Sequence, residues 1–268
     1  MAMLKSLRKL LGAAERTPQA SLPEGARAYA VGDIHGRSDL FKALSRAIEA
    51  DDAARGAANS CVVLLGDLID RGPDSAGGIR LAREWQSRRK LHILMGNHEE
   101  MLLDSLESEE VLRHFLRYGG KETLLSYPVD PVAYTRAELG EVMAMMHAAI
   151  PDQDLAFIRT FEDSLTLGDY LFVHAGIDPD HPVDGQRRSD LRWIREPFLS
   201  HAASFGPIVV HGHTISQAAE LRPNRIGIDT GAWRSGRLTA LGLEGTARWL
   251  IEAIETDGSI AIAQRSIR

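Results

Sequence analysis

The sequence lacks the features that mark disulfide-bonded and membrane-spanning proteins. It contains one cysteine, Cys61, among 268 residues, so an intrachain disulfide is excluded. Because Cys61 directly precedes an apolar run, we expect a buried thiol rather than a reactive one. No apolar run is long enough to span a bilayer, and no cleavable secretory signal is recognisable. These absences predict a cytoplasmic location.

An excess of positive charge is also absent. The chain has 31 Lys and Arg against 37 Asp and Glu, a formal net charge of -6. This balance argues against nucleic acid as a partner, because phosphate backbones recruit proteins with surplus basic residues. A small phosphate-binding pocket is still allowed, since it needs only a few local cations.

The first 25 residues are expected to form a tail outside the folded domain. Leucines at positions 4, 7, 10 and 11 recur at helical spacing, with basic residues on the other side. The pattern allows membrane contact by an amphipathic helix, but a frayed terminal helix is favoured because chain termini are often disordered. Residues 12–25 are small and polar and predict a linker, so the domain is expected to cover residues 26–268.

Short apolar runs alternate with helical patterns along the rest of the chain, which predicts an α/β fold. Seven runs are predicted strands: Ala28–Val31, Cys61–Leu65, Leu91–Met95, Tyr170–Val173, Ile208–Val210, Ile226–Ile228 and Leu238–Leu243. Residues 102–167 have a mostly helical pattern without a clear strand and predict a helical insertion. The pattern after residue 237 is again that of strands, and Asp257-Gly258 predicts a hairpin turn.

Five of these strands are followed at once by residues that can bind metal ions. The segments are Gly32-Asp33-Ile34-His35-Gly36, Gly66-Asp67-Leu68-Ile69-Asp70-Arg71-Gly72, Gly96-Asn97-His98-Glu99, His174-Ala175-Gly176 and His211-Gly212-His213-Thr214. The carboxyl ends of strands in open α/β sheets form the edge where ligands bind. The flanking glycines allow the backbone to turn sharply beside a small ligand.

The residue types indicate which ligand binds at this edge. Asp, His and Asn without a cysteine cluster suit divalent cations such as Mn, Fe or Zn. Two such ions about 3.5–4 Å apart can hold a hydroxide and stabilise the attacking and leaving oxygens of an in-line displacement at phosphorus. Arg71 follows directly and can donate two hydrogen bonds to phosphate oxygens.

Each motif taken alone also has a structural alternative. The first segment can be a polar turn, Asp67 can cap a loop, and Asn97-His98 can cap a helix that begins near Glu99. His174 can be a hydrogen-bonded core histidine. Five strand ends with ligand-type residues in one chain favour a shared metal site, because motifs gain force from their common context.

In this order the motifs resemble those of the calcineurin-like metallophosphoesterases, and within them the bacterial and phage members of the phosphoprotein phosphatase family. The resemblance runs from about Tyr29 to Gly245. It includes three further segments, Gly119-Gly120-Lys121-Glu122-Thr123-Leu124, Leu191-Arg192-Trp193-Ile194-Arg195-Glu196 and Ile228-Asp229-Thr230-Gly231-Ala232. It implies a four-layer α/β/β/α sandwich with a dimetal site at one edge.

The resemblance also implies which residues bind the two metal ions. Asp33 and His35 are expected to bind the first ion, Asp67 both ions, and Asn97, His174 and His213 the second. Asn97 is also expected beside the substrate. His213 matches the family's Gly-His-Thr histidine, so His211 is the less favoured ligand. Manganese is the favoured ion, with iron, zinc or nickel as alternatives.

The remaining chemistry is assigned in the same way. His98 is expected to protonate the leaving alkoxide, with Asp70 orienting the imidazole. Arg71 and Arg195 are expected to clamp the phosphate. Arg192 is the alternative to Arg195, and either arginine can instead be a solvent-facing helix charge. A hydroxide between the two ions would attack phosphorus opposite the ester oxygen.

Three functions remain open. A serine/threonine phosphoprotein phosphatase, with possible dual specificity, is favoured over a symmetrical dinucleoside tetraphosphate hydrolase. Those hydrolases tend to lack the Asp of the second motif and the Glu after Asn-His, whereas this chain has Asp70 and Glu99. A non-catalytic, phosphate-sensing scaffold is disfavoured because every matched ligand position is filled. The physiological substrate, the native metal pair and the oligomeric state are not indicated.

Overall fold

The computed structural model describes residues 19–267, and the amphipathic segment at residues 4–11 lies outside this range. Residues 19–25 lie against the domain. Leu22 is buried, its N–H donates to the carbonyl of Gly245 at 2.9 Å, and the N–H of Ser21 donates to Asp169 at 2.9 Å. The prediction of a linker is therefore wrong for residues 19–25, because Leu22 belongs to the core between the sheets.

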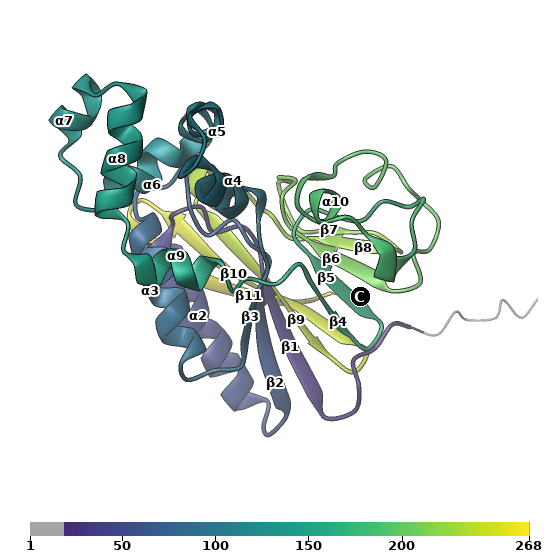
Figure 1. Cartoon of the computed structure of the whole chain (residues 1–268). Coiled ribbons are helices and arrows are strands. Elements are labelled where there is room, and N and C mark those ends of the chain that lie inside the picture. The colour runs from purple at the N-terminus through teal and green to yellow at the C-terminus, as the bar shows by residue number, and fades with distance from the viewer. Residues whose placement is uncertain (1–18, 268) are drawn as a thin grey trace, which may run out of the picture.

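Two mixed β-sheets form the centre of the molecule (Figure 1). The first has the order β11-β10-β9-β1-β2-β3, with bounds β1 (Ala26–Val31), β2 (Asn59–Leu64), β3 (Leu91–Ile93), β9 (Arg237–Glu244), β10 (Ala247–Thr256) and β11 (Ser259–Ile267). The second has the order β4-β5-β6-β8-β7, with bounds β4 (Ser164–Leu167), β5 (Tyr170–Val173), β6 (Ile208–His211), β7 (Glu220–Leu221) and β8 (Arg225–Gly227). Strands β1, β2 and β3 are parallel to one another, as are β5, β6 and β8.

All seven predicted strands are present, and β4 and β7 were not predicted. β4 lies inside residues 102–167, so the expectation that this segment lacks a strand is wrong. β4 is four residues long and half-exposed at a sheet edge, which is why no apolar run marks it. Asp257 and Gly258 both have positive φ, 52° and 77°, and join β10 to β11 in the predicted hairpin turn.

The layers follow from strands that are buried on both faces. Along β1, Tyr29 and Val31 point to the helices, whereas Ala28 and Ala30 point to the second sheet, as the two-residue period of a strand requires. Helices α2 (Ser38–Ala54) and α3 (Ser75–Gln86) cover the outer face of the first sheet.

On the outer face of the second sheet lie the short helices η2 (Val183–Gly185) and α10 (Arg188–Trp193) with their loops. Leu191 and Phe198 fill a small core there. The expected order of helices, sheet, sheet and helices is therefore confirmed, with a thin fourth layer. Cys61 is buried between the sheets, as expected.

A mostly helical segment lies above the edge where β1, β2 and β3 end (Figure 1). It comprises α4 (Asn97–Ser105), α5 (Glu109–Phe115), η1 (Leu116–Gly120), α6 (Lys121–Ser126), α7 (Pro131–Arg136), α8 (Leu139–Ala149) and α9 (Asp152–Ile158). A short helix, α11 (Ala232–Ser235), precedes β9. Arg83 of α3 and Asp154 of α9 form an ion pair at 2.6 Å, which fastens the segment to the helices of the first sheet.

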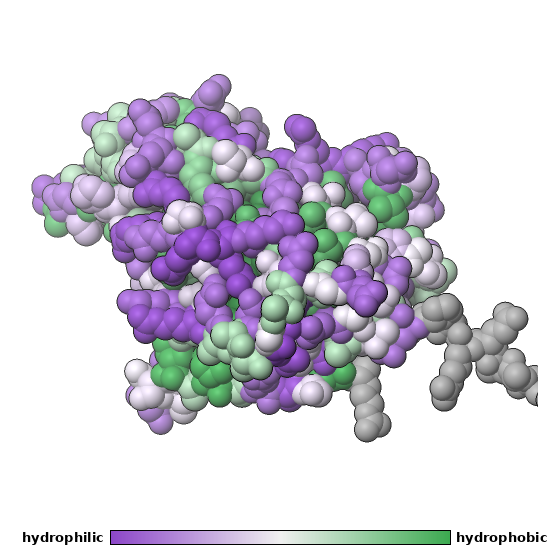
Figure 2. Space-filling view, turned by 90° about the horizontal axis from the view of Figure 1, so that it is seen from below, coloured by the Kyte–Doolittle hydropathy of each residue, from purple (hydrophilic) through white to green (hydrophobic). Residues whose placement is uncertain are grey.

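Within residues 19–267, none of the helices combines the length and the apolar character that crossing a bilayer requires. Figure 2 shows that the face seen from below is mainly hydrophilic, with hydrophobic residues in small patches. Such a mixture is ordinary for protein surfaces, where apolar atoms contribute a large share of the exposed area.

Candidate metal centre

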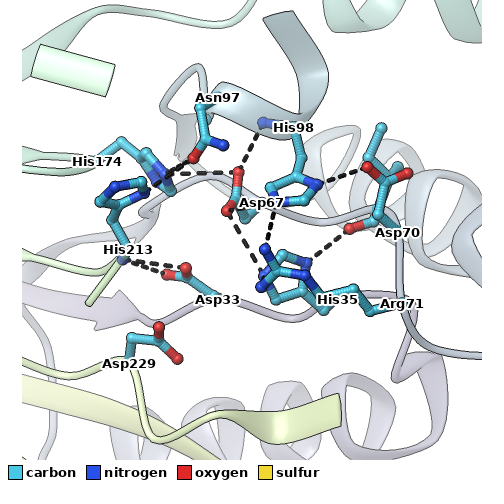
Figure 3. Close-up of polar contacts among 12 residues, drawn as sticks. Asp33, His35, Asp67, Asp70, Arg71, Asn97, His98, His174, His213 and Asp229 are labelled. Carbon is cyan, nitrogen blue, oxygen red and sulfur yellow. Dashed lines mark hydrogen bonds and ion pairs between the residues drawn. The ribbon is translucent and has the colours of Figure 1, made fainter. Parts of the chain in front are cut away.

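The five predicted strand ends converge at one edge of the two sheets (Figure 3). Asp33 and His35 follow β1, Asp67 follows β2, Asn97 and His98 open α4 after β3, His174 follows β5, and His213 follows β6. Strands of both sheets therefore contribute, and the residues come from positions 33 to 213 of the chain.

Asp67 lies at the centre of this convergence. Its Oδ2 lies 3.6 Å from His35 Nε2 and 3.9 Å from His98 Nε2, while its Oδ1 lies 3.5 Å from His174 Nε2. Two buried groups can each hold a metal ion, one formed by His35, Asp67 and His98 and the other by Asp67, His174 and His213. Since Asp67 belongs to both groups and offers one oxygen to each side, it is placed to bridge two ions.

The hydrogen bonds of His174 show that a cation fits the second group. Its Nδ1 lies 2.7 Å from the carbonyl oxygen of Leu65, so Nδ1 carries the proton and Nε2 presents a lone pair. That lone pair faces Asn97 Oδ1 at 3.0 Å and the carboxylate of Asp67. Three electron-pair donors that share no proton are an arrangement that a metal ion satisfies.

Only one histidine of the His-Gly-His segment joins this group. His213 Nδ1 lies 2.9 Å from Asn97 Oδ1. The ring of His211 instead stands edge-on to Phe198, with 5.0 Å between the ring centroids, and its Nδ1 lies 3.0 Å from the carbonyl oxygen of Gly212. This geometry favours His213 over His211 as a ligand.

In the first group, the guanidinium of Arg71 contacts both histidines, His35 and His98. His35 Nδ1 lies 2.8 Å from the carbonyl of Ile69, so its Nε2 accepts a hydrogen bond from Arg71 Nη1 at 2.8 Å. Arg71 Nη2 approaches His98 Nε2 at 2.7 Å. Because His35 Nε2 is the atom that would bind a metal ion, an ion there would take the place of the guanidinium, and Arg71 would then be free to bind a phosphate.

Asp33 lies beside the two groups rather than in either of them. Its carboxylate accepts the N–H of His213 at 3.0 and 3.2 Å. A side chain at Gly212 would meet Asp33, because a Cβ there would lie 2.0 Å from Asp33 Oδ1. The expectation that Asp33 shares an ion with His35 therefore requires its carboxylate to turn from this backbone contact.

Asp229 is a second buried carboxylate next to Asp33 (Figure 3), and its Oδ2 has no hydrogen-bond partner. Burial, followed by the charges of Asp229 and Asp67, raises the pKa of Asp33 well above its usual range. Burial also raises the pKa of Asp229 to about 6. Two neighbouring buried carboxylates are stabilised by a cation. Sequence reasoning missed Asp229, although it lies in the segment Ile228–Ala232 that carried part of the resemblance.

The histidines of the site differ in the direction of their pKa shifts. It lowers the pKa of His35 and of His174, and it lowers the pKa of His213 to about 3, so these imidazoles are neutral and able to bind metal. Burial also opposes the charged form of His98, but the carboxylates of Asp67 and Asp70 outweigh it and raise the pKa of His98. His98 is thus the histidine suited to carry a proton.

Asp70 is placed by hydrogen bonds from the helical segment. Asp70 Oδ2 lies 2.5 Å from His98 Nδ1. The hydroxyl of Thr123 donates to Asp70 Oδ1 at 2.5 Å and accepts the N–H of Asp70 at 2.8 Å. The carboxylate of Glu99 accepts the N–H groups of Asp67 at 2.9 Å and Leu68 at 2.7 Å. Sequence reasoning missed these supporting roles of Thr123 and Glu99.

The backbone at these positions is unusual. His35, Asp67, Asp70, Arg71 and His213 have φ between 46° and 73°, a region that residues with a side chain rarely adopt. Residues 19–267 contain a sixth such non-glycine residue, in the β10–β11 turn. Strained conformations of this kind concentrate at functional sites, where the surrounding structure holds them.

The two candidate arginines of the later motif differ in their contacts. Arg192 donates to Glu100 and to Asp163, each at 2.5 Å, and is held in a structural network. Arg195 forms no ion pair among the described residues, and together with Arg71 it lines the cavity above the metal groups. The geometry therefore favours Arg195 over Arg192 as a phosphate ligand.

Comparison with known proteins agrees with this site. The sequence profile of the calcineurin-like phosphoesterase family matches residues 26–232. The chain is 39% identical over 217 residues to serine/threonine-protein phosphatase 1 of Salmonella typhimurium, covering 79% of this chain and 89% of that protein. It is also 33% identical over 186 residues to a symmetrical bis(5'-nucleosyl)-tetraphosphatase of Nitrosococcus oceani, covering 65% of this chain and 63% of the relative.

Among solved structures, a cold-active protein-tyrosine phosphatase of a psychrophilic Shewanella species matches with a TM-score of 0.57 at 17% identity, covering 94% of this chain and 83% of that one. At this identity the likeness shows the fold alone. The family profile, in contrast, covers most of the domain and all of the strand ends described above. The chain belongs to the calcineurin-like phosphoesterase family and is a metal-dependent phosphoester hydrolase.

Proposed function

We propose that this protein is a phosphomonoesterase of the serine/threonine phosphoprotein-phosphatase class, with activity on other phosphomonoesters as well. The contact between His98 and Asp70 carries this proposal, because it supplies an oriented proton donor for a leaving alkoxide. The Salmonella relative, which matches over 89% of its own length, supports the same class.

In this proposal Asp67 would contribute to both of two divalent ions, of which manganese is favoured. Asp33 and His35 would hold the first ion with it, Asp33 taking the place that His98 has in the first buried group, and the oxygen of Asn97 with His174 and His213 would hold the second. When bound, the two ions supply the positive charge that activates a water molecule and neutralises phosphoryl oxygens.

The other residues act on the substrate directly. Arg71 and Arg195 donate hydrogen bonds to the phosphoryl oxygens and hold the phosphate above Asp67. His98 donates the proton on Nε2 to the departing alkoxide, while Asp70 accepts the N–H of Nδ1 and stabilises the protonated ring. Thr123 keeps Asp70 in place for this contact.

Symmetrical cleavage of dinucleoside tetraphosphates is the second candidate, and the Nitrosococcus relative is the observation that favours it. Asp70 and Glu99 favour the phosphatase, since the dinucleoside tetraphosphate hydrolases tend to lack these two residues. Both are buried and fully engaged in hydrogen bonds at the strand ends. The scaffold alternative has no support, because the ligand residues are assembled in two buried groups.

A direct comparison of substrates tests the proposal. Purified enzyme with Mn²⁺ is given a phosphoserine peptide and diadenosine tetraphosphate, and kcat/KM is measured for each by phosphate release and by nucleotide chromatography. We expect the peptide to be the better substrate. Faster cleavage of the tetraphosphate to two diphosphates would overturn the proposal. The Asp67→Asn variant, assayed in parallel, controls for contaminating phosphatases.

A further inference from the structure

The cavity above the metal groups opens into a larger one. The smaller cavity has a volume of about 230 Å³ and is lined by Asp67, Asn97 and His98 among others. The larger has a volume of about 650 Å³. The two cavities share Arg71, Tyr118, Arg195 and His213. A phosphoryl group held by Arg71 and Arg195 therefore leaves the rest of its substrate in the larger cavity.

The larger cavity is positively charged although the whole chain is acidic. Four basic residues line it, namely Arg71, Arg117, Lys121 and Arg195, against one carboxylate, Glu122. None of these four forms an ion pair with a carboxylate within residues 19–267. The chain has a formal net charge of -6, so this concentration of unpaired cations is local. Arg71 and Arg195 serve the scissile phosphate, which leaves Arg117 and Lys121 for a second anionic group.

The segment that carries Arg117 and Lys121 is attached to the catalytic residues by close backbone contacts. The N–H of Arg71 donates to the carbonyl of Gly119 at 3.1 Å. Gly119 has a φ of 115°, and a Cβ there would lie 2.7 Å from the Arg71 nitrogen, so only glycine permits this approach. Residues Leu116–Gly120 join α5 to α6 through a kink at Gly119, whose φ of 115° and ψ of 4° are not helical.

Thr123, two residues after Lys121, holds Asp70 by the hydrogen bonds described above. The backbone that carries Arg117 and Lys121 is thus held beside Arg71, although both side chains are exposed. The Nζ of Lys121 lies 5.9 Å from the centre of the Tyr134 ring and also lines the larger cavity.

The walls of the cavity suit a peptide. Tyr118 and Trp233 line it and are 45% and 37% exposed. The Trp233 ring also faces the Arg71 guanidinium at 5.7 Å. Exposed aromatic side chains and arginine are enriched where proteins bind other chains.

We propose that Arg117 and Lys121 form a second anion subsite, and that this protein prefers phosphopeptides with an acidic side chain or a second phosphate near the phosphorylated residue. The preference rests on the proposed phosphatase function and names the class of its substrates. Each charge contact at such an exposed site contributes modestly, so we expect a preference of about three- to tenfold that weakens with salt.

Competition against p-nitrophenyl phosphate hydrolysis tests the subsite. The inhibition constants of three phosphoserine peptides are compared, one with Asp before the phosphoserine, one with Asp after it, and one neutral. We expect one acidic peptide to bind about three- to tenfold more tightly than the neutral one at about 50 mM NaCl, and the ratio to shrink at about 500 mM. Equal constants for all three peptides would overturn the subsite.

Variants separate the subsite from a general charge effect. In the double variant Arg117→Ala and Lys121→Ala the ratio should fall towards one. The charge-conserving pair Arg117→Lys and Lys121→Arg should keep it, and so should Arg113→Ala, which removes an exposed arginine of α5 outside the cavity lining. A ratio unchanged by the double alanine variant contradicts the proposal.

The same peptides separate this inference from the proposed function. If the acidic peptide inhibits more tightly but no phosphate is released from it, the phosphatase proposal fails and the anion subsite stands. If all peptides are dephosphorylated with equal kcat/KM and inhibit equally, the function stands and the subsite fails. If the double alanine variant loses more affinity for diadenosine tetraphosphate than for the acidic peptide, the subsite serves a polyphosphate chain and the peptide preference is wrong.

Discussion

The two halves of the metal centre are held in different ways, although Asp67 belongs to both. In the first half His35 and His98 contact Arg71, and His98 also contacts Asp70. In the second half His174 is fixed by a backbone carbonyl and meets the amide of Asn97, the carboxylate of Asp67 and the ring of His213. In the proposed function the first half would therefore connect metal binding to proton transfer and phosphate binding, whereas the second half would only hold a cation.

Asp67→Asn breaks both halves at once, and we expect it to have the largest effect. The amide cannot bridge two cations as a carboxylate does, so kcat/KM should fall by about three orders of magnitude or more. Metal analysis should find fewer than two ions per chain. A variant that keeps both ions and substantial activity would show that Asp67 does not bridge.

His98→Asn and His174→Asn separate the two halves. His98→Asn should keep its ions but lower kcat by about 10²- to 10⁴-fold for an alkyl phosphate, with a smaller loss for p-nitrophenyl phosphate, whose leaving group needs no proton. His174→Asn should instead weaken binding of one ion, so that added Mn²⁺ restores part of the activity. Equal losses on both substrates in His98→Asn would contradict its role as proton donor.

Arg195→Ala and Arg192→Ala distinguish a substrate contact from a structural one. Arg195→Ala should lower kcat/KM by about ten- to a hundredfold, as loss of a charged hydrogen bond of about 1.5–3 kcal/mol implies, with little change in Tm. Arg192→Ala leaves Glu100 and Asp163 without their partner and should lower Tm. If Arg192→Ala lowers kcat/KM more than Arg195→Ala at unchanged Tm, the assignment of the two arginines is reversed.

The smallest expected effect concerns Asp229 in metal-free protein. Its pKa is about 6 in the folded state and about 3.9 in an unfolded chain, so the stability it contributes is present below about pH 4 and is lost as pH rises through about 6. Relative to wild type, Asp229→Asn should therefore gain about 2 kcal/mol of unfolding free energy between pH 4 and pH 7. Part of this gain comes from Asp33, because the charge of Asp229 raises its pKa; more distant titrating groups largely cancel in the difference.

Urea unfolding of both proteins in a chelator, at several pH values, measures this gain. Calorimetric titration with Mn²⁺ supplies the complementary result, because loss of a carboxylate near Asp33 should weaken metal binding. A difference in unfolding free energy that does not change with pH would show that the pKa of Asp229 is the same in the folded and the unfolded chain.

Much of the fold and of the metal centre was predictable because apolar runs and glycines mark the strand ends so clearly. Each ligand-type residue directly follows a run that is buried on both faces, and parallel strands bring such positions to one edge. The strands β4 and β7 escaped prediction because they are short and half-exposed at the edges of the second sheet. Leu22 escaped because a single apolar residue among small polar ones gives no periodic signal.

The supporting contacts were not predictable for a different reason. Thr123 reaches Asp70 across 53 residues of sequence, and nothing in a threonine inside a helical pattern indicates which residue it will contact. Arg192 and Arg195 lie on one short segment, and sequence could not separate them because the difference depends on Glu100 and Asp163. Such contacts depend on how distant elements pack, which a linear pattern does not contain.

The ligand residues come from both sheets, so a bound metal pair would add a cross-link to the apolar packing and the few hydrogen bonds that join the two layers. Asp67 extends from one layer and His174 from the other, and the ion that both would hold joins the layers at the open rim. Hydrogen exchange should accordingly slow in β2 and β5 together when metal is added. The cation pair would then stabilise the packing of the two sheets in addition to its role in hydrolysis.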